Sequence, residues 1–337
     1  MNHKINQLPQ GNCYLDLHLH IDGAITPKIA IALAKIEGMS LPTTDEDELA
    51  KYLEAPKDGK NLVDYLKAFD LPVSLMQSQA AIKEAVYLVQ EKLKSQGIIY
   101  AELRFAPQLH TKHGLTQKEV VEAAIEGLHR SDLKSNLILC CMRFENNKTE
   151  NLETEKIAKE FLNCGVVAMD LAGPEADNPV EHYTEIFEQA KKDGIPFTIH
   201  AGEASGAESV RKAVELGASR IGHGVRSMED ISVVKLLAQK KIPLELCPTS
   251  NLDTKVFESL SEYPIEELIA EGVIVTLNSD NPVVSATNQK NEIKKIRKQF
   301  HLNNSQIKEL LLNGAEVSFA DDKTKKFIRT EISQVYA

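Results

Sequence analysis

Two histidines on one predicted strand are the first candidates for chemistry. The segment LDLHLHIDG places His18 and His20 two residues apart. Residues at this spacing share one face of a strand, so both imidazoles point to the same side near the strand's end. A single histidine there would more often be structural, but a pair that leads into a glycine-containing loop is half of a metal site. We therefore expect His18 and His20 to bind a metal ion.

Three further apolar runs end in residues of the same kinds. TIHAGE supplies His200 and Glu203, and IGHG supplies His223. LNSDN adds Asp280 and Asn281. Imidazole nitrogens together with a carboxylate oxygen suit Zn²⁺, and no thiolate is needed. In barrel enzymes with two metals, a modified lysine on the fourth strand commonly bridges the two ions. The fourth run here, VVAMDLAG, contains no lysine, so we expect one Zn²⁺ per chain.

Eight short apolar runs are expected to be the strands that position these residues. They cover residues 14–20, 98–105, 137–143, 166–173, 196–203, 220–224, 243–250 and 273–280. Helical periodicity lies between most of them, for example over residues 116–129 and 231–238, and this alternation indicates a parallel sheet. Near-continuous apolar strands need cover on both faces, and eight can close into a barrel. The predicted fold class is α/β, a TIM (β/α)8 barrel, whose active sites lie at the carboxyl ends of the strands.

One connection, over about residues 21–97, is much longer than the others and predicts a helical insertion after the first strand. It contains an apolar stripe at positions i, i+3, i+4 and i+7 of a helix, formed by Leu62, Tyr65, Leu66 and Phe69. The stripe either lines or covers the active-site pocket, or simply packs an extra helix on the barrel. We see no linker that would divide residues 1–337, so a single barrel domain is expected.

Composition excludes several classes of protein. The 337 residues carry 39 basic and 49 acidic side chains, a net charge of −10 without a basic run, which argues against a nucleic acid polymer as partner. No apolar stretch reaches the length of a membrane span, and the first 12 residues lack the apolar core of a signal peptide. The five cysteines have no CxxC spacing and are expected to be reduced thiols of a cytoplasmic protein.

The motifs taken together resemble the adenosine deaminase family. They are LDLHLHIDGAITP, YAELRFAPQLH, DLAGPE, TIHAGEASGAESVRKAVELGASRIGHGVR, ELCPTSN and LNSDNP, in the same order and with similar spacing from about residue 12 to residue 320. HxHxDG combined with HAGE, GHG and SD is a specific pattern, although each part alone is weak. The HxE and PCxxC pattern of the cytidine deaminases is absent from the sequence.

The resemblance implies a role for each of these residues. The zinc ligands would be His18, His20, His200 and Asp280. Of these, His20 would also lie beside the substrate, and Asp280 would also take part in catalysis. Zinc would lower the pKa of a bound water towards about 7, which makes a hydroxide available to attack C6 of the purine. Glu203 would protonate N1, and His223 would orient the water and either stabilise its charge or take its proton. Gly173 would offer its backbone N–H to N3, and Asp22 would accept from the ribose 5′-hydroxyl.

Plainer interpretations stay open for four of the residues. Glu203 could be an acid in the first turn of the following helix, where the helix dipole favours it. Asp22 and Gly173 could each do no more than shape a turn. Glu245, within the run PLELCP, either faces outward or is hydrogen-bonded to a histidine at the rim, since an unpaired buried carboxylate is costly; we favour the second.

Asn281 departs from the family pattern, in which SDD or TDD is more frequent than the SDN of this chain. The second acid is taken to donate a hydrogen bond to purine N7, which requires a protonated carboxyl group. An asparagine amide donates at every pH, so Asn281 is compatible with purine binding.

The expected activity is hydrolysis of a cyclic amidine C–N bond by a zinc enzyme of purine salvage. Adenosine and 2′-deoxyadenosine would give inosine and 2′-deoxyinosine with ammonia. One alternative is an adenine deaminase, although relatives that act on the free base carry HLEG where this chain has residues 20–23 as HIDG. A second alternative is a nucleoside-binding barrel without activity. A nucleoside 5′-phosphate would need basic groups near the ribose, and the IDGAITP loop has only Lys28 nearby.

Overall fold

Eight parallel strands form the centre of the computed structural model, which describes residues 13–56 and 58–336. Their bounds are β1 Tyr14–His20, β2 Ile98–Phe105, β3 Lys134–Met142, β4 Val166–Ala172, β5 Thr198–Ala201, β6 Arg220–His223, β7 Leu244–Leu246 and β8 Val275–Leu277. They pair in the orders β1-β2-β3-β4 and β5-β6-β7-β8. Every strand pair is parallel, as the alternation predicts.

Two single bridges join these four-stranded halves into a ring. Met169 of β4 is bridged to Phe197 just before β5, and Leu19 of β1 is bridged to Asp280 just after β8. At the second junction the backbone N–H of His20 donates to the carbonyl of Asp280 at 2.9 Å. The order and these bridges are those of a (β/α)8 barrel, so the predicted fold class is confirmed.

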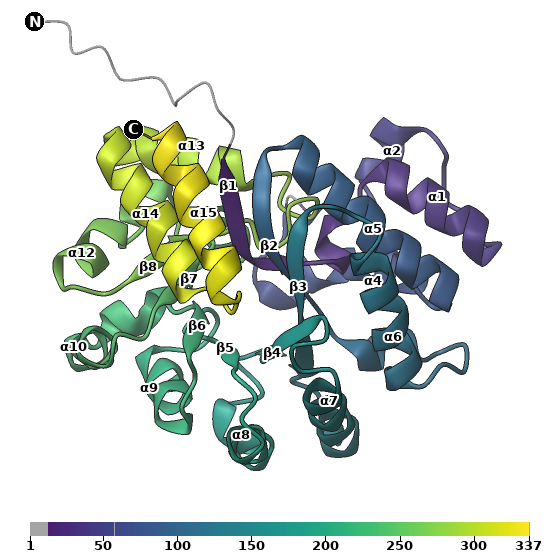
Figure 1. Cartoon of the computed structure of the whole chain (residues 1–337), viewed down its shortest axis with the longest axis horizontal. Helices are drawn as coiled ribbons and strands as arrows, with labels where there is room; N and C mark the ends of the chain where they lie inside the picture. The colour runs from purple at the N-terminus through teal and green to yellow at the C-terminus, as the bar shows by residue number, and fades with distance from the viewer. Residues whose placement is uncertain (1–12, 57, 337) are drawn as a thin grey trace, which may run out of the picture.

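Helices surround the strands in chain order (Figure 1). The ring contains α5 Gln79–Ser95, α6 Gln117–Leu128, α7 Lys148–Glu160, α8 Thr184–Lys192, α9 Ala207–Leu216, α10 Ile231–Lys240, α12 Ile265–Ala270, α13 Gln289–Gln299, α14 Asn304–Val317 and α15 Asp322–Val335, with the short α11 Pro248–Asp253 after β7. Local sequence explains where they begin: a capping box of Thr116 and Glu119 starts α6. The predicted helices over residues 116–129 and 231–238 are confirmed as α6 and α10.

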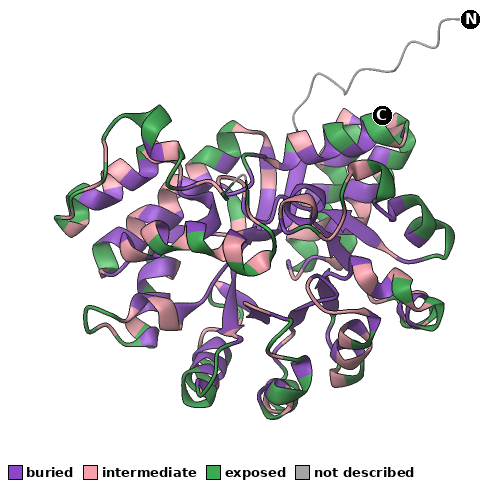
Figure 2. Cartoon of the chain, turned by 180° about the vertical axis from the view of Figure 1, so that it is seen from behind, coloured by how far each residue is buried: buried purple, intermediate pink, exposed green. Residues whose placement is uncertain are grey.

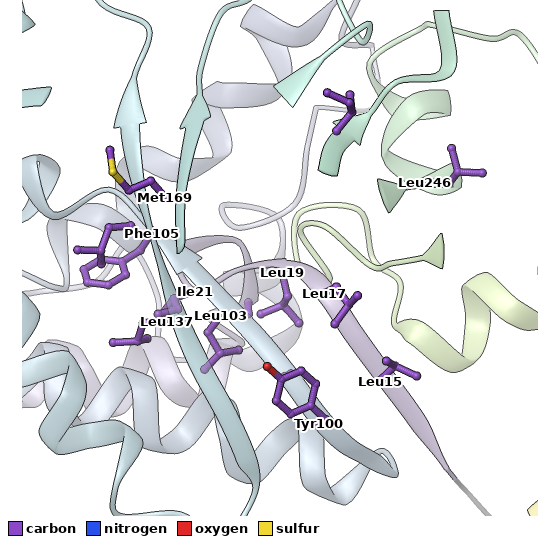
Figure 3. Close-up of a cluster of buried hydrophobic side chains, with 14 of the residues drawn as sticks. Leu15, Leu17, Leu19, Ile21, Tyr100, Leu103, Phe105, Leu137, Met169 and Leu246 are labelled. Carbon is purple, nitrogen blue, oxygen red and sulfur yellow. The ribbon is translucent and has the colours of Figure 1, made fainter. Parts of the chain in front are cut away.

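The apolar core lies between the strands and these helices (Figures 2 and 3). Leu15, Leu17 and Leu19 alternate along β1 with the polar residues that face the barrel interior, and all three are buried. Buried colour follows the inner faces of the helices in Figure 2, while their outer faces are exposed. This two-sided burial explains why the strands read as near-continuous apolar runs.

Several strands end earlier than their apolar runs. The strand expected through residue 250 ends at Leu246, because Pro248 begins α11, where a missing N–H costs nothing. The run 196–203 leaves the sheet after Ala201, since Gly202 takes a φ of +71°. These early ends leave Glu203 and its neighbours in loops at the barrel rim.

The connection between β1 and β2 contains the expected helical insertion, together with the ring helix α5. Its elements are η1 Asp22–Ala24, α1 Pro27–Glu37, α2 Glu46–Ala50, α3 Leu62–Leu66, η2 Lys67–Phe69 and α4 Asp70–Ser74. The apolar stripe therefore runs over α3 and η2 rather than over one regular helix. Its Tyr65 hydroxyl lies 2.8 Å from the Ser285 hydroxyl after β8, so the insertion is anchored across the barrel rim.

The cysteines of the described chain are free thiols, with only Cys164 exposed. No helix in the described part of the chain is both long and apolar enough to cross a bilayer. The segment 1–12, on which the expected lack of a signal peptide depends, lies outside the described residues.

Candidate active site

Four side chains converge at the carboxyl end of the barrel, with one ligand atom of each within 4.8 Å of all the others. They are His18, His20, His200 and Asp280. His18 Nε2 and His20 Nε2 lie 3.4 and 3.5 Å from Asp280 Oδ1. His20 Nε2 lies 3.3 Å from His200 Nε2. The structure thus brings together the four residues predicted to bind a metal.

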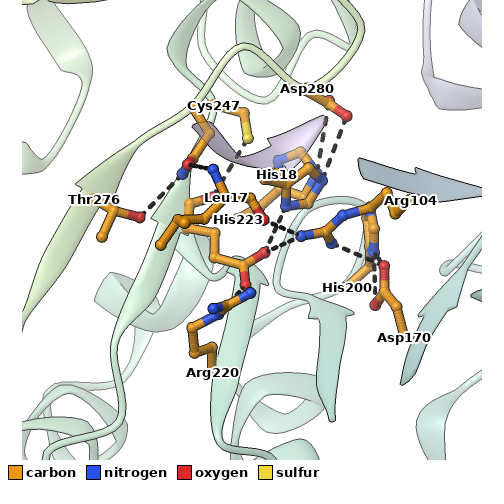
Figure 4. Close-up of polar contacts among 12 residues, drawn as sticks. Leu17, His18, Arg104, Asp170, His200, Arg220, His223, Cys247, Thr276 and Asp280 are labelled. Carbon is orange, nitrogen blue, oxygen red and sulfur yellow. Dashed lines mark hydrogen bonds and ion pairs between the residues drawn. The ribbon is translucent and has the colours of Figure 1, made fainter. Parts of the chain in front are cut away.

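The far sides of two of these imidazoles are held by buried carboxylates (Figure 4). Glu245 Oε2 lies 2.7 Å from His18 Nδ1, and Asp170 Oδ2 lies 2.9 Å from His200 Nδ1. A histidine that donates its Nδ1 proton to a carboxylate presents the Nε2 lone pair on its other side. Glu245 is therefore the inward-facing partner of a rim histidine, which is the favoured of its two interpretations.

The donor set fits a cation. His18 Nε2 and Asp280 Oδ1 are buried and have no hydrogen-bond partner in the structure, and buried polar atoms are seldom left unpaired. Burial lowers the pKa of His20 well below its usual value, which keeps that imidazole neutral. Burial opposes ionisation of Asp280, but the nearby charge of His18 outweighs it and lowers the pKa of Asp280. The pKa of His18 is raised: burial and Arg104 oppose its protonated form, but Asp280 and Glu245 outweigh them. Metals bind the neutral imidazole and the ionised carboxylate, so a bound cation would displace the proton from His18 Nε2.

A second possible donor group shares two of these residues, with His223 and Cys247 in place of the other two histidines. Burial raises the pKa of the Cys247 thiol well above its usual value, so a thiolate is disfavoured there. The Asn251 amide donates to His223 Nδ1 at 3.1 Å, so a neutral His223 carries its proton on Nε2 and has no lone pair there for a metal. The set of three histidines with Asp280 is therefore the better metal site.

Buried arginines form ion pairs with the two carboxylates that contact the histidines (Figure 4). Arg104 binds both of them, at 2.9 Å from Asp170 and 2.9 Å from Glu245. Arg220 lies 2.6 Å from Glu245 on the other side and 2.6 Å from Glu102. These pairs keep Glu245 ionised inside the barrel. Burial opposes its ionisation, but the two arginines hold the pKa of Glu245 well below its usual value.

Glu203 is a buried carboxyl group beside the metal-ligand cluster. Burial, followed by the charges of Asp280 and Glu175, raises its pKa from 4.5 to about 8. Its Oε2 lies 3.5 Å from His223 Nε2, and its Oε1 accepts from the Thr254 hydroxyl at 3.3 Å. The following helix α9 is capped by Gly206 without a side-chain hydrogen bond, so Glu203 does not cap it. A carboxyl group that is protonated at neutral pH can act as a general acid.

His223 is held in one tautomer by its neighbours. The Tyr263 hydroxyl donates to Asn251 Oδ1 at 3.1 Å, which turns the Asn251 amide nitrogen toward His223 Nδ1. With Nδ1 as acceptor, a neutral His223 carries its proton on Nε2, the atom that faces Glu203. Its φ of +59°, matched by a φ of +59° at Asp280, is unusual outside glycine. Such backbone strain is concentrated at functional sites.

These groups face a cavity of about 440 Å³, a volume typical of small-molecule sites. Asp22, Gly173 and Asn281 line it, as do the four residues of the predicted stripe. Asp22 is buried and also accepts from the backbone N–H of Gly23 at 3.2 Å, so it shapes the turn as well as facing the cavity. A Cβ at Gly23 would lie 2.1 Å from Asn281 Oδ1, which shows why glycine is needed there.

A wider cavity of about 710 Å³ adjoins the first and shares Leu62, Pro174 and Glu203 with it. It contains none of the four converging metal-ligand residues. The stripe lines the smaller cavity and also packs on the loop after β8, where Tyr65 belongs to one apolar cluster with the buried Val284. Both interpretations of the stripe, lining and packing, thus have a structural basis.

Leu66→Ala tests whether the stripe positions a substrate. We expect kcat/KM to fall about tenfold, the effect of losing one good apolar contact, because the insertion then closes less well over the cavity. Leu71→Ala is the matched control, since Leu71 packs on the main core and does not line the cavity. An unchanged kcat/KM with a lowered Tm in Leu66→Ala would support plain packing instead.

Sequence reasoning missed the residues that hold the site in place. Asp170 and Glu175 lie within and just after β4, in the segment DLAGPE that had drawn attention only for Gly173. Arg104 lies in the motif YAELRFAPQLH, and Asn251 ends ELCPTSN. Charged residues inside an otherwise apolar run were the available signal, because a buried charge requires a partner.

Comparison with known proteins identifies the family of the chain. The sequence profile of the family described as "Adenosine deaminase" matches residues 14–335. The chain is 44% identical over 330 residues to an adenosine deaminase of Haemophilus ducreyi, covering 96% of each protein. It is 38% identical over 323 residues to an adenosine deaminase of Clostridium perfringens, covering 94% of this chain and 97% of that one.

Solved structures of related enzymes share the whole fold. An adenine deaminase from Arthrobacter aurescens superposes with a TM-score of 0.85 at 26% identity, over 96% of this chain and 99% of that one. The N6-methyl-AMP deaminase from Arabidopsis thaliana superposes with a TM-score of 0.82 at 25% identity, over 96% and 97% of the two chains. Related barrels thus carry activities on different adenine derivatives.

Proposed function

This chain belongs to the adenosine deaminase family, and from that premise we propose how its site works. The protein is a hydrolase that deaminates adenosine to inosine and ammonia. We extend this to 2′-deoxyadenosine and to a role in purine salvage in the cytoplasm. The observation that carries the proposal is the convergence of His18, His20, His200 and Asp280. All but His18 line the same cavity as Glu203, whose pKa is raised to about 8 by burial first of all.

One Zn²⁺ per chain is proposed at the four converging residues. The orphaned His18 Nε2 and Asp280 Oδ1 support this assignment, as does a nitrogen-rich set without a thiolate. When bound, Zn²⁺ would lower the pKa of a water molecule from 15.7 towards about 7 and so supply the nucleophile at neutral pH. Asp170 and Glu245 orient two of the ligand histidines by accepting their Nδ1 protons.

Glu203 and His223 are the residues proposed to act on the base and on the attacking water. We propose that Glu203 donates its proton to purine N1, which removes the aromatic resistance to addition at C6. The neutral His223, with its proton on Nε2, then orients the attacking water and stabilises the charge that develops on its oxygen. Of the two roles considered for His223, the Asn251 contact favours this one over removal of the water's proton. The hydroxyl proton on the tetrahedral carbon then passes to the amino nitrogen, the C6–N bond breaks, and ammonia leaves as the C6=O bond of inosine forms. The proton that the water lost on becoming hydroxide restores Glu203.

The remaining cavity residues are assigned to the base and the ribose. We propose that the backbone N–H of Gly173 donates to N3, Asn281 donates to N7, and Asp22 accepts from the 5′-hydroxyl. At Gly173 the φ of +109° favours glycine, and a Cβ would approach the Arg143 backbone nitrogen to 3.3 Å. Leu62, Tyr65, Leu66 and Phe69 are proposed to cover the bound nucleoside; His20 lies beside it.

Adenine deaminase activity is the competing proposal, favoured by the structural similarity to the Arthrobacter enzyme. Against it stand the higher identities to proteins named adenosine deaminase and the sequence HIDG at residues 20–23, where relatives that act on the free base carry HLEG. A 5′-phosphate, as in the substrate named for the Arabidopsis enzyme, would need compensating cations. Lys112 is the only lysine or arginine that lines the cavity among the described residues.

Substrate choice can be tested with the zinc-loaded protein. Adenosine, 2′-deoxyadenosine, adenine and AMP are supplied separately, and the loss of the adenine chromophore and the release of ammonia are followed. We expect both nucleosides to be deaminated, with kcat/KM for adenine and AMP lower by at least about 10²-fold, because each lacks or alters the ribose end that the site contacts. Preferential turnover of adenine would replace the proposal with its competitor. A folded, metal-loaded protein with no turnover would indicate a binding barrel.

A further inference from the structure

Glu175, three residues after β4, has an unusual number of hydrogen-bond donors. Its buried carboxylate accepts from the backbone N–H groups of residues 202–205, at 2.8, 3.0, 2.7 and 2.9 Å in chain order. The Ser209 hydroxyl donates to the same carboxylate at 2.5 Å. Five donors on one carboxylate compensate for its removal from water.

The segment that Glu175 binds is the loop that carries Glu203. Residues 202–205 belong to neither β5 nor α9, so regular secondary structure does not hold their N–H groups. Within the described chain no acceptor other than Glu175 is found for these four N–H groups. Their carbonyls are held from the opposite side, where Arg226 donates to Gly202 and Ala204. The loop is therefore clamped between Glu175 and the loop after β6.

Glu175 also connects this loop to a second segment that lines the substrate cavity. It lies two residues after Gly173, which lines the cavity together with Glu203. In the proposed function Gly173 contacts purine N3 and Glu203 contacts N1, the two ring nitrogens that flank C2 of the base. The hydrogen bonds of Glu175 set the distance between the two loops that make these contacts.

We propose that Glu175 is a positioning residue, which holds the acid Glu203 at a fixed distance from Gly173 so that N1 and N3 of the same purine ring meet both. The inference rests on the proposed function. Glu175 touches no reacting atom in this assignment. It acts through the backbone of residues 202–205, and after burial and Asp280 its charge is also among the causes that raise the pKa of Glu203. A misplacement of about 1 Å at a reacting group costs about 10²-fold in rate.

Two variants of the zinc-loaded, full-length protein should lose kcat to different extents. Glu175→Gln keeps one acceptor oxygen but turns an amide N–H₂ toward the donors, and we expect kcat for adenosine to fall about tenfold. Glu175→Ala leaves all four N–H groups without an acceptor, and we expect a loss of about 10²-fold in kcat, with a smaller change in KM. Zinc content should stay at the parent's level in both, because none of the four proposed ligands contacts Glu175.

Two controls separate positioning from general stability. Asp177→Asn changes an exposed acid of the same loop in the same way, and we expect parental kcat. Ile332→Ala removes a fully buried side chain in α15 and lowers Tm, but should leave kcat at the parent's value. If Ile332→Ala lost as much kcat as Glu175→Ala at an equal loss of Tm, the proposal would be overturned.

Hydrogen exchange provides a readout that does not depend on turnover. Amide exchange over residues 202–205 should be faster in Glu175→Ala than in the parent, intermediate in Glu175→Gln and parental in Asp177→Asn. Parental exchange in Glu175→Ala, or parental kcat in that variant, would overturn the proposal. If the parent itself failed to deaminate adenosine, the proposed function would fall, while the exchange measurement would still decide whether Glu175 holds the loop.

Discussion

His200→Ala is expected to lose both bound zinc and deaminase activity. His200 is one of four proposed ligands, and its removal opens the site while leaving the neighbouring Asp170 carboxylate without its histidine partner. Changing a residue that merely supports a ligand costs about 10–100-fold in metal affinity, so loss of a ligand itself should exceed that. Zinc content after dialysis against a chelator, measured together with kcat, tests the expectation.

His129→Ala is the matched control, because His129 is an exposed histidine at the end of α6. It should retain zinc and turnover at the parent's values. His18→Ala and Asp280→Ala should behave as His200→Ala does, since their ligand atoms belong to the same cluster. Stoichiometric zinc in an active His200→Ala protein would contradict the proposed metal site.

Glu203→Gln is expected to keep zinc and lose turnover. The amide preserves the size of the side chain but has no proton to give to purine N1, and general acid catalysis contributes about 10²–10⁴-fold in rate. We therefore expect kcat to fall by about that factor with zinc content unchanged. Steady-state kinetics and metal analysis on the same preparation provide both measurements.

Glu208→Gln, the same change at an exposed position in α9, should have parental kcat. Near-parental turnover in Glu203→Gln would mean that another group protonates the base. These outcomes separate the acid from the metal site, because Glu203→Gln and His200→Ala should differ in zinc content while both lack activity.

Glu203→Gln also has an effect on stability that depends on pH. In the metal-free protein the pKa of Glu203 is raised from 4.5 to about 8, chiefly by burial. Between these two values the folded state binds more protons than the unfolded state, so the free energy of unfolding decreases as pH rises. A glutamine does not ionise. The Tm of Glu203→Gln should therefore fall less than that of the parent between about pH 5 and about pH 9.

The sequence by itself determined the barrel and the location of its site. Alternating runs predicted eight parallel strands, and the two-residue spacing of His18 and His20 placed them on one strand face. Both inferences depend on local backbone geometry, since side chains alternate along a strand and barrel sites lie where strands end. The limits of the strands were less well predicted, because Pro248 and the positive φ of Gly202 end them within apolar runs.

Only the tertiary structure decided which groups orient the site residues. Glu245 meets His18 across 227 positions of sequence, and Arg104 joins the carboxylate partners of two ligand histidines from different strands. Glu175 holds the loop of Glu203. A buried charge is stable only with a partner, and closure of the barrel, rather than any local pattern, determines which side chain across the interior becomes that partner.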